Sequence, residues 1–454
     1  MTTSARPNVI VFFTDQQRWD TTGVHGNPLD LTPNFDRMAR RGTDVHYSFT
    51  CQPVCGAARS TLQTGQYGTT TGCYKNGVPL PQNVRTLAHH FCAGGYSTAY
   101  IGKWHLGTDD GATVESERGG YEYWLASNLL EFTSDAYQTR LFDNDNQPVD
   151  LPGYRVDALT DAAIRYIDQA SKGDPPFYLF ISYIEPHHQN HRDDYPAPDG
   201  YAERYAGRWM PQDLAGLGGG SAWSHMAGYL GMIKRLDEAL GRLLDALRSL
   251  NCLDNTIILF TSDHGNHFKT RNDEYKRSPH ESSLRVPTAL QGGEFDGGGR
   301  LSQLISLIDL PPTLLDAAGL PVPEDMQGRS FMPLVRRQSS AWHDDLFVQI
   351  SETQVGRAVR TARWKYAVAA PDLDGYQHPG SPVYVETELF DLLADPHELN
   401  NLIGMSSHAE TTAVLRERLI RRMVEAGEAA PEIRPAQPRQ AFWQIHVSSD
   451  EAHT

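Results

Sequence analysis

Cysteine is scarce in this chain, and its number is odd. Five cysteines, at positions 51, 55, 73, 92 and 252, occur among 454 residues. Secreted domains that depend on disulfides carry denser, even-numbered sets, so this set excludes a disulfide framework, and we expect a reduced, cytoplasmic protein. A zinc site at Cys51 and Cys55 is excluded as well, because no second Cys or His pair has the required spacing.

Long hydrophobic runs and an excess of positive charge are also missing. The N-terminal stretch MTTSARPNVIVFFTD has one Arg, no small-residue cleavage site and an apolar run from Val9 to Phe13 only, which fits neither a signal peptide nor a membrane span. Lys and Arg total 40 against 56 Asp and Glu, a formal net charge of -16. We therefore expect neither nucleic acid nor a membrane as a partner, and an anionic ligand needs a local basic pocket.

The sequence does contain four apolar runs that end abruptly in polar residues: NVIVFFTDQQ, YSTAYIGKWH, PFYLFISYIEPHH and NTIILFTSDHG. Such runs are typical of parallel strands that are buried on both faces. Helices are predicted between them, one from Pro33 to a Gly42 stop with Thr32 as N-cap, and one over about Met226 to Leu250. The pattern predicts an α/β fold with a large, mostly parallel central sheet flanked by helices.

The polar residues that end these runs are candidates for an active site. They include Asp15, Gln16, Lys103, His105, Glu185, His187, Asp263 and His264. In open α/β sheets, ligands bind outside the carboxyl ends of the strands. Loop polarity explains one such cluster, but four clusters that carry Asp, Lys and His together favour a functional site.

The pattern changes after about Trp342. Short predicted strands, LFVQI and AVRTARWKYAVAA, precede an amphipathic helix near Thr411 to Ala426, and the Pro-, Gly- and Asp-rich stretch from Pro371 to Tyr384 is a predicted loop. We expect a catalytic domain at 1–340 and a smaller C-terminal α+β subdomain at 341–454, packed on the first.

Cys55 opens the stretch CGAARSTLQTG, in which Ala, Arg, Leu and Gln favour helix and Gly65 supplies a stop. The N-terminus of a helix favours negative charge, so it stabilises a thiolate or an anionic substrate. Arg59, four residues on, lies on the same helical face. The alternative is that Cys55 is only a small hydrophobic residue of the core, as most free cysteines are. The position of Arg59 argues against this interpretation.

Cys55-Gly56-Ala57-Ala58-Arg59, followed by Leu62, Thr64 and Gly65, resembles the sulfatase signature, in which the cysteine is converted to formylglycine. GYSTAYIGKWHLG resembles the second sulfatase signature, and SLIDLPPTLLDAAG, GRSF and ELFDLLADPHELNNL are also similar to that family. The resemblance covers almost the whole chain. It implies an alkaline-phosphatase-like fold, Cys55 rather than Cys51 as the catalytic residue, and a formylglycine-generating enzyme as a partner during maturation.

The resemblance also implies a divalent-cation site formed by Asp15, Gln16, Cys55, Asp263 and His264. Ca²⁺ is the usual ion of the family and suits oxygen ligands, whereas His264 makes Mn²⁺ conceivable. Many relatives have Asp at the position of Gln16 and Asn at that of His264, so the ligand charge is lower here.

Further residues match the family positions that surround the sulfate and the leaving oxygen. These catalytic and substrate-binding residues are Lys103, His105, His187 and Lys276, with Arg59 holding residue 55 and His188 as an alternative to His187. Each Lys or His, taken alone, is more often a surface or core-satisfying group. Trp104, Lys269 and Arg271 are candidates for substrate specificity; the alternatives are a packed aromatic residue and two solvated bases.

The implied reaction is hydrolysis of a sulfate monoester to an alcohol and inorganic sulfate. A phosphonate monoester or phosphodiester hydrolase is a competing interpretation, because those enzymes share these motifs; the Lys103-Trp104-His105 element favours a sulfatase. A non-catalytic anion-binding protein with unmodified Cys55 is a third, since Ala57 replaces the commoner Pro. A sulfated sugar is the first expected substrate, and an aryl or alkyl sulfate the second.

Overall fold

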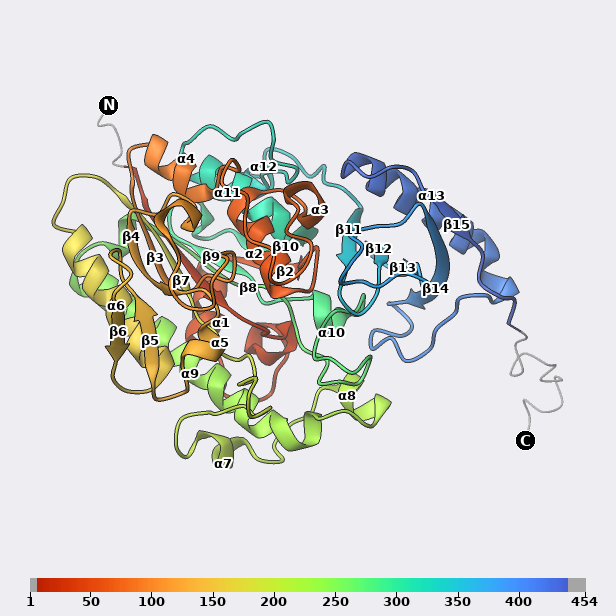
Figure 1. The fold of residues 1–454 in the computed structure, drawn as a ribbon, viewed down its shortest axis with the longest axis horizontal. Helices are drawn as coiled ribbons and strands as arrows, with labels where there is room; N and C mark the ends of the chain where they lie inside the picture. The colour runs from red at the N-terminus through yellow and green to blue at the C-terminus, as the bar shows by residue number, and fades with distance from the viewer. Residues whose placement is uncertain (1–5, 440–454) are drawn as a thin grey trace.

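Two β-sheets of unequal size organise the molecule. The computed structural model describes residues 6–439. A large sheet with helices on both faces occupies one side of the view in Figure 1, and the smaller sheet lies beside it, built from the C-terminal part of the chain. No helix in residues 6–439 is both long enough and apolar enough to cross a bilayer.

The large sheet has ten strands in the order β10-β2-β9-β8-β1-β7-β3-β4-β5-β6. Their bounds are β1 (Asn8–Thr14), β2 (Thr43–Phe49), β3 (Ser97–Lys103), β4 (Tyr123–Ser127), β5 (Thr139–Phe142), β6 (Pro148–Leu151), β7 (Phe177–Ser182), β8 (Thr256–Ser262), β9 (Ala289–Gln291) and β10 (Gly299–Ser306).

The four apolar runs form the centre of this sheet, as predicted. They are β1, β3, β7 and β8, and they pair in parallel as β8-β1-β7-β3. Towards the edges the sheet is mixed, because β9 pairs antiparallel with both β2 and β8, and β5 pairs antiparallel with both β4 and β6. Four parallel central strands place four carboxyl ends at one edge, which is the geometry that the site requires.

Alternate residues of β1 contact the two helical layers, as the twofold period of a strand demands. Val9, Val11 and Phe13 pack in one apolar core with residues of α2 (Cys55–Thr64), α4 (Leu87–Ala93) and α11 (Leu310–Ala317). Ile10 and Phe12 pack in the opposite core with α1 (Pro33–Arg41), α6 (Arg155–Ala170) and α9 (Ala222–Ser249).

Shorter helices complete this part of the chain. They are α3 (Gly68–Thr71), α5 (Leu130–Thr133), α7 (Tyr201–Tyr205), α8 (Gln212–Leu217), α10 (Glu281–Leu284) and α12 (Met332–Val335), with 3-10 turns η1 (Trp19–Thr21), η2 (Gly23–His25), η3 (Glu115–Glu117), η4 (Leu253–Asn255), η5 (Gly293–Phe295) and η6 (Leu307–Asp309).

The start of α1 differs from the prediction in its chemistry. Thr32 occupies the N-cap position but makes no side-chain capping hydrogen bond. The free amides of the first turn are satisfied instead by Asp237 of α9, whose carboxylate accepts hydrogen bonds from the backbone N–H of Asn34 at 3.1 Å and of Phe35 at 2.8 Å. A carboxylate from a neighbouring helix thus does what a local N-cap does elsewhere.

The smaller sheet has the order β11-β12-β13-β14-β15, all antiparallel except the last pair. Its bounds are β11 (Asp345–Ile350), β12 (Gly356–Thr361), β13 (Trp364–Ala369), β14 (Val383–Asp391) and β15 (Glu432–Arg434), with η7 (Ser406–His408) and α13 (Ala409–Glu425) on its outer face. The sheet packs against the large domain through β11 and a buried ion network in which Lys365 Nζ contacts Glu281 at 2.9 Å and Glu398 at 2.5 Å.

Candidate active site

The predicted site residues converge at the carboxyl edge of the large sheet. Asp15 follows β1, Lys103 ends β3, His187 follows β7, and Asp263 follows β8. Cys55 begins α2, which packs over the same edge. All five are buried, with exposed fractions from 0% to 3%. Residues separated by up to 248 positions in the chain are therefore brought into one enclosed cluster.

A glycine is required next to Lys103. Gly102 has φ +112°, in the region that favours glycine, and a Cβ there would lie 2.0 Å from the carbonyl oxygen of Ser182 on β7. The absence of a side chain lets β3 approach β7 and sets the position of Lys103.

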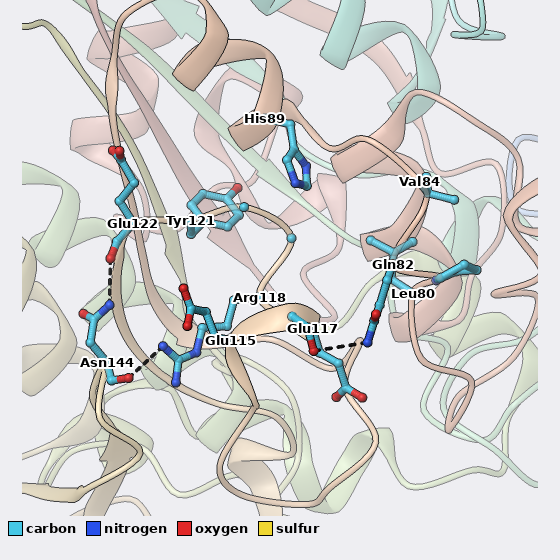
Figure 2. Close-up of a pocket in the computed structure, with 14 residues that line it drawn as sticks. Leu80, Gln82, Val84, His89, Glu115, Glu117, Arg118, Tyr121, Glu122 and Asn144 are labelled. Atoms are coloured by element: carbon cyan, nitrogen blue, oxygen red, sulfur yellow. Dashed lines mark hydrogen bonds between the residues drawn. The ribbon is translucent and has the colours of Figure 1, made fainter.

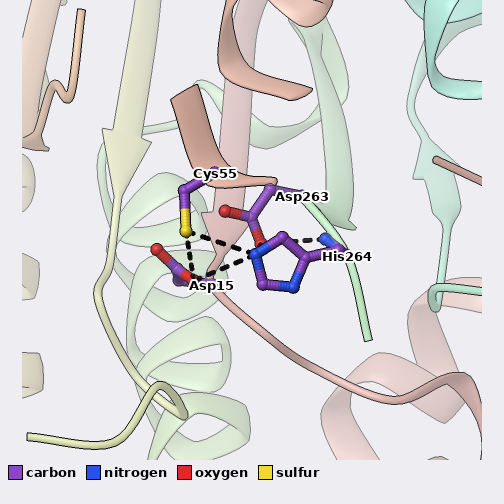
Figure 3. Close-up of side chains that lie close together, drawn as sticks. All are labelled: Asp15, Cys55, Asp263 and His264. Carbon is purple, nitrogen blue, oxygen red and sulfur yellow. Dashed lines mark hydrogen bonds and ion pairs between the residues drawn. The ribbon is translucent and has the colours of Figure 1, made fainter. Parts of the chain in front are cut away.

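The thiol of Cys55 points into the cluster (Figure 3). Its Sγ lies 2.7 Å from Lys276 Nζ, 3.3 Å from His264 Nε2 and 3.7 Å from Asp15 Oδ1. Burial raises the pKa of the thiol, but the charges of Lys276, Lys103 and His264 outweigh it, and the pKa of Cys55 lies well below its usual range. Cys51 is different: burial raises the pKa of its thiol to about 12, and its Sγ lies 3.6 Å from Thr61 Oγ1 of α2.

Four side chains form a set of potential metal ligands, Asp15, Cys55, Asp263 and His264, whose ligand atoms lie within 4.8 Å of one another. We call them the acidic cluster. The two carboxyls of this cluster differ in their electrostatics. Burial opposes ionisation of both carboxyls; Lys103 nevertheless lowers the pKa of Asp15, whereas burial and the charge of Asp15 raise the pKa of Asp263 to about 7.

Buried polar atoms with few or no partners indicate a cation site. Both polar atoms of the Gln16 side chain are buried without a hydrogen-bond partner, and Oδ2 of Asp263 has only a 3.5 Å ion pair with Arg59. Buried polar atoms without partners cost about 1 to 3 kcal/mol each, and a bound cation removes that cost for oxygen donors. Carboxylate oxygens, an amide oxygen and one imidazole fit a divalent cation.

Basic residues hold the carboxylates of this cluster in place. Arg59 Nη2 lies 2.9 Å from Asp15 Oδ2 and 3.5 Å from Asp263 Oδ2, and its Nη1 donates to Ser182 Oγ at 2.7 Å. Lys103 Nζ bridges Asp15 Oδ2 and Glu131 Oε1, both at 2.9 Å. Fully buried ion pairs are sensitive to loss of either partner, because the remaining charge is left in a low-dielectric interior.

Two histidines and a lysine face Cys55 from the other side. Lys276 Nζ lies 3.2 Å from His187 Nε2, and His187 Nδ1 lies 2.7 Å from the carbonyl oxygen of His188. The carbonyl can only accept, so Nδ1 carries the proton and Nε2 presents a lone pair to Lys276. Burial, reinforced by Lys276, lowers the pKa of His187. His105 also hydrogen-bonds the Cys55 side chain.

His188 does not replace His187 at this position. Its ring stacks on that of His187 with centroids 4.3 Å apart, and Tyr275 packs on it at the same separation. His187 therefore contacts Lys276, and the ring of His188 covers the ring of His187.

The three specificity candidates have other surroundings. Trp104 is fully buried and packs edge-on against Tyr100 and Trp124, which are the surroundings of a core aromatic residue; its role in substrate binding stays a prediction. Arg271 donates to the carbonyl oxygens of His397 and Glu398, which ties it to the C-terminal part of the chain. Lys269 pairs with Asp193 at 2.9 Å on the surface.

Glu131, the second partner of Lys103, is the main site residue that the sequence did not reveal. It lies in the short helix α5, outside every motif, and its ion pair joins residues 28 positions apart. A single Glu outside any motif gives no sequence signal of a functional role, so its position beside Lys103 is seen only in the structure.

A pocket elsewhere on the molecule is separate from these residues (Figure 2). It lies between α4 and the segment 115–122, and Gln82, His89, Glu115 and Arg118 are among the residues that line it. None of the predicted site residues contributes to it.

The doubly flanked α/β sheet, with a thiol and a buried carboxylate pair at its carboxyl edge, is the architecture that the sequence resemblance implies. Comparison with known proteins agrees. The sulfatase family model matches residues 7–320, and a model of the N-sulphoglucosamine sulphohydrolase C-terminal region matches residues 273–425. The chain belongs to the sulfatase family and is a sulfuric ester hydrolase.

Relatives and solved structures extend over nearly the whole chain. It is 29% identical over 442 residues to the ulvan-active sulfatase of Formosa agariphila, covering 93% of this chain and 82% of the relative. It is 26% identical over 498 residues to the N-acetylglucosamine-6-O-sulfatase of Bacteroides thetaiotaomicron, covering 91% and 86%. A solved structure from Bacteroides fragilis, described as a sulfatase, matches with a TM-score of 0.79 at 24% identity, covering 94% and 97%.

Proposed function

We propose that Cys55 is converted to formylglycine and that the hydrated aldehyde attacks the sulfur of a carbohydrate sulfate ester. The observation that carries this proposal is the placement of the Cys55 side chain, which begins α2 and faces Lys276 at 2.7 Å and His264 at 3.3 Å. In the unmodified chain, Sγ stands in for one hydroxyl of the hydrate.

A divalent cation, Ca²⁺ first and Mn²⁺ second, is proposed to bind between Asp15, Gln16, Asp263, His264 and residue 55. When bound, it would withdraw electron density from oxygen atoms of residue 55 and of the sulfate. The buried side-chain atoms of Gln16 and Asp263 that lack hydrogen-bond partners support this assignment. Arg59 fixes the orientation of Asp15 and Asp263 through its ion pairs with both.

The proposed reaction has two chemical steps. The attacking hydrate hydroxyl gives its proton to the carboxylate of Asp263 as its oxygen bonds to sulfur and the ester S–O bond breaks. The leaving alcohol oxygen takes its proton from the His187–Lys276 pair or from His105. The second hydroxyl then gives its proton to His105, the C–O bond to sulfate breaks, and the aldehyde and inorganic sulfate result. Addition of water to the aldehyde restores the hydrate.

Stabilisation of the sulfate charge is assigned to three cationic or hydrogen-bonding groups. Lys103, Lys276 and His187 surround residue 55 and are all buried. In an enclosed site, such groups act at a low dielectric constant and need little rearrangement during reaction. They also recruit an anion to a chain whose net charge is -16.

The relative named N-acetylglucosamine-6-O-sulfatase supports a sulfated sugar as substrate. An aryl or alkyl sulfate is the second candidate. We further propose that the protein functions in the cytoplasm, with the four cysteines other than Cys55 as free thiols, and that residues 1–340 form the catalytic domain.

The test combines mass spectrometry with turnover. Protein from its native host is alkylated, digested and analysed over Cys51 to Arg59; we expect an aldehyde or its hydrate at residue 55 and alkylated Cys51. Sulfate release from a sulfated glucosamine is then compared with hydrolysis of a phenyl phosphonate. A strong preference for the phosphonate would overturn the sulfatase assignment in favour of a phosphonate monoester hydrolase. Full alkylation of Cys55 would show that the residue is unmodified and would favour the non-catalytic anion-binding protein.

A further inference from the structure

A second group of potential metal ligands lies outside the active site. His25 ends the 3-10 turn η2, and Asp44 and His46 lie in the first half of β2, two residues apart and therefore on the same face of the strand. His25 Nε2 lies 4.0 Å from Asp44 Oδ1, and His46 Nδ1 lies 3.8 Å from Asp44 Oδ2. We call these three residues the imidazole cluster.

Each residue of this cluster has a buried polar atom that no other group satisfies. His25 Nε2, Asp44 Oδ1 and His46 Nδ1 are all without a hydrogen-bond partner. The exposed fraction of the side chain is 0% for His25, 6% for Asp44 and 20% for His46. Three unsatisfied atoms that converge within 4.8 Å are costly unless something binds between them.

The surrounding contacts fix which atoms remain free. Thr22 Oγ1 donates to the carbonyl oxygen of Trp19 at 3.2 Å, so it accepts from His25 Nδ1, which lies 2.6 Å away. The neutral ring then carries its lone pair on Nε2, directed at the cluster. Arg300 Nε donates to Asp44 Oδ2 at 2.8 Å and leaves Oδ1 free. Such supporting hydrogen bonds are what orient metal ligands in proteins.

We infer that His25, Asp44 and His46 bind a divalent transition-metal ion such as Zn²⁺ or Co²⁺. Two imidazoles and one carboxylate select this class of ion over Ca²⁺ and Mg²⁺. Ligand atoms of a tetrahedral site lie about 3.3 Å apart, given metal–ligand distances of about 2.0 to 2.1 Å. The rings of His25 and His46 are stacked with centroids 4.9 Å apart, so binding requires one imidazole to rotate as well as to move closer.

The position of the cluster gives the ion a structural role. His25 belongs to the segment that continues from Asp15 and Gln16 through η1 and η2, whereas Asp44 and His46 belong to β2. An ion here would fasten that segment to the large sheet. The ring of Trp19 lies edge-on to that of His25, with centroids 5.6 Å apart, and a surface cavity lined by Val24, Asp44 and Arg300 gives access from solvent.

The test uses full-length protein saturated with Ca²⁺ and titrated with Co²⁺, followed by calorimetry and by the visible absorption of the bound ion. We expect one Co²⁺ per chain at this site, retained in Asp263→Asn. His25→Gln and His46→Gln should each weaken it by at least about 100-fold, because loss of a ligand costs more than the roughly 10- to 100-fold that loss of a supporting group costs. His378→Gln, which changes an exposed histidine, is the matched control.

Each outcome separates this site from the active site. Loss of Co²⁺ binding in Asp263→Asn, with full binding in both His25→Gln and His46→Gln, would assign the ion to the acidic cluster and overturn the inference. Absence of Co²⁺ uptake by the wild-type protein would overturn it as well. Sulfate release should be unchanged in His25→Gln, so a failed activity assay in wild type counts against the proposed function alone.

Discussion

The acidic cluster and the imidazole cluster are both groups of potential metal ligands, yet their surroundings differ. The acidic cluster, Asp15, Cys55, Asp263 and His264, is fully enclosed and ringed by Arg59, Lys103 and Lys276. The imidazole cluster, His25, Asp44 and His46, is reached from the surface, and its one ion-pairing arginine, Arg300, is already engaged by Asp44.

The difference separates a reaction centre from a structural site. A reaction centre needs cationic groups with capacity left for the substrate anion. Among the described residues, Lys276 Nζ hydrogen-bonds only the side chains of Cys55 and His187. At the imidazole cluster no such group remains. The donor atoms differ in the same sense, mostly oxygen in the first cluster and mostly nitrogen in the second, so the two are expected to select different ions.

The largest effect is expected from removal of the nucleophile. Cys55→Ala should lower sulfate release by on the order of a millionfold, as loss of a nucleophile does in other hydrolases, while the thermal unfolding temperature stays close to that of wild type because Ala is compatible with the first turn of α2. Cys51→Ala is the control and should keep both. Loss of turnover in the Cys51 variant alone would reverse the assignment of the two cysteines.

Lys276→Met removes a charge next to residue 55 and should reduce kcat by about 100- to 1,000-fold, the usual cost of one charge-stabilising group in an enclosed site. Lys269→Met, seven residues away and partly exposed, should change kcat less than about threefold by the same argument. Steady-state kinetics on a sulfated glucosamine measures both. Equal reductions of kcat in the two variants would mean that Lys276 does not stabilise charge in the reaction.

Cation binding at the acidic cluster should depend on pH. Burial and Asp15 raise the pKa of Asp263 to about 7 in the metal-free protein, above its ordinary value of 3.8. The cation binds the ionised carboxyl, so affinity should increase as pH rises from 5 to about 7 and then level off, with proton release on binding. Calorimetry in buffers of different ionisation enthalpy measures that proton, and a pH-independent affinity would contradict the assignment.

The same raised pKa has a consequence for folding stability. Because the folded value exceeds the unfolded one, Asp263 contributes stability to the metal-free protein below about pH 4, and this contribution is lost as pH rises to about 7. Saturating Ca²⁺ should reverse the trend, which thermal unfolding at a series of pH values would reveal.

The smallest effect on activity belongs to the imidazole cluster. His25→Gln should leave kcat within about twofold of wild type while abolishing the rise in unfolding temperature that Co²⁺ produces, a stabilisation of about 2.7 kcal/mol when the free ion is a hundredfold above Kd. A large fall in kcat would instead show that this segment controls the geometry of Asp15 and Gln16.

The sequence was sufficient to predict those helices and strands that depend on neighbouring residues of the chain. Apolar runs predicted β1, β3, β7 and β8, and the motif around Cys55 predicted α2 with its Gly65 stop, which has φ +69°. The C-terminal helix is also close to its predicted bounds.

Long-range partners could not be predicted. Asp237 caps α1 from 202 positions away, Glu131 pairs with Lys103 across a loop, and His25 meets His46 only because β2 returns beside the segment after β1. The burial of Trp104 was also not predicted: its neighbours Lys103 and His105 face the site, but the chain turns at His105, where φ is +63°, and the indole packs in the core.

The enclosure of Cys55 sets an order of events in the life of the chain. Its side chain is 1% exposed, at the base of a helix whose ten residues are all buried, so a maturation enzyme cannot reach it once the sheet has closed over α2. The proposed oxidation of this residue would therefore have to precede folding, while the segment is still an extended peptide. Under that proposal, molecules that fold first would keep the thiol, and the active fraction of a preparation would depend on whether oxidation or folding came first.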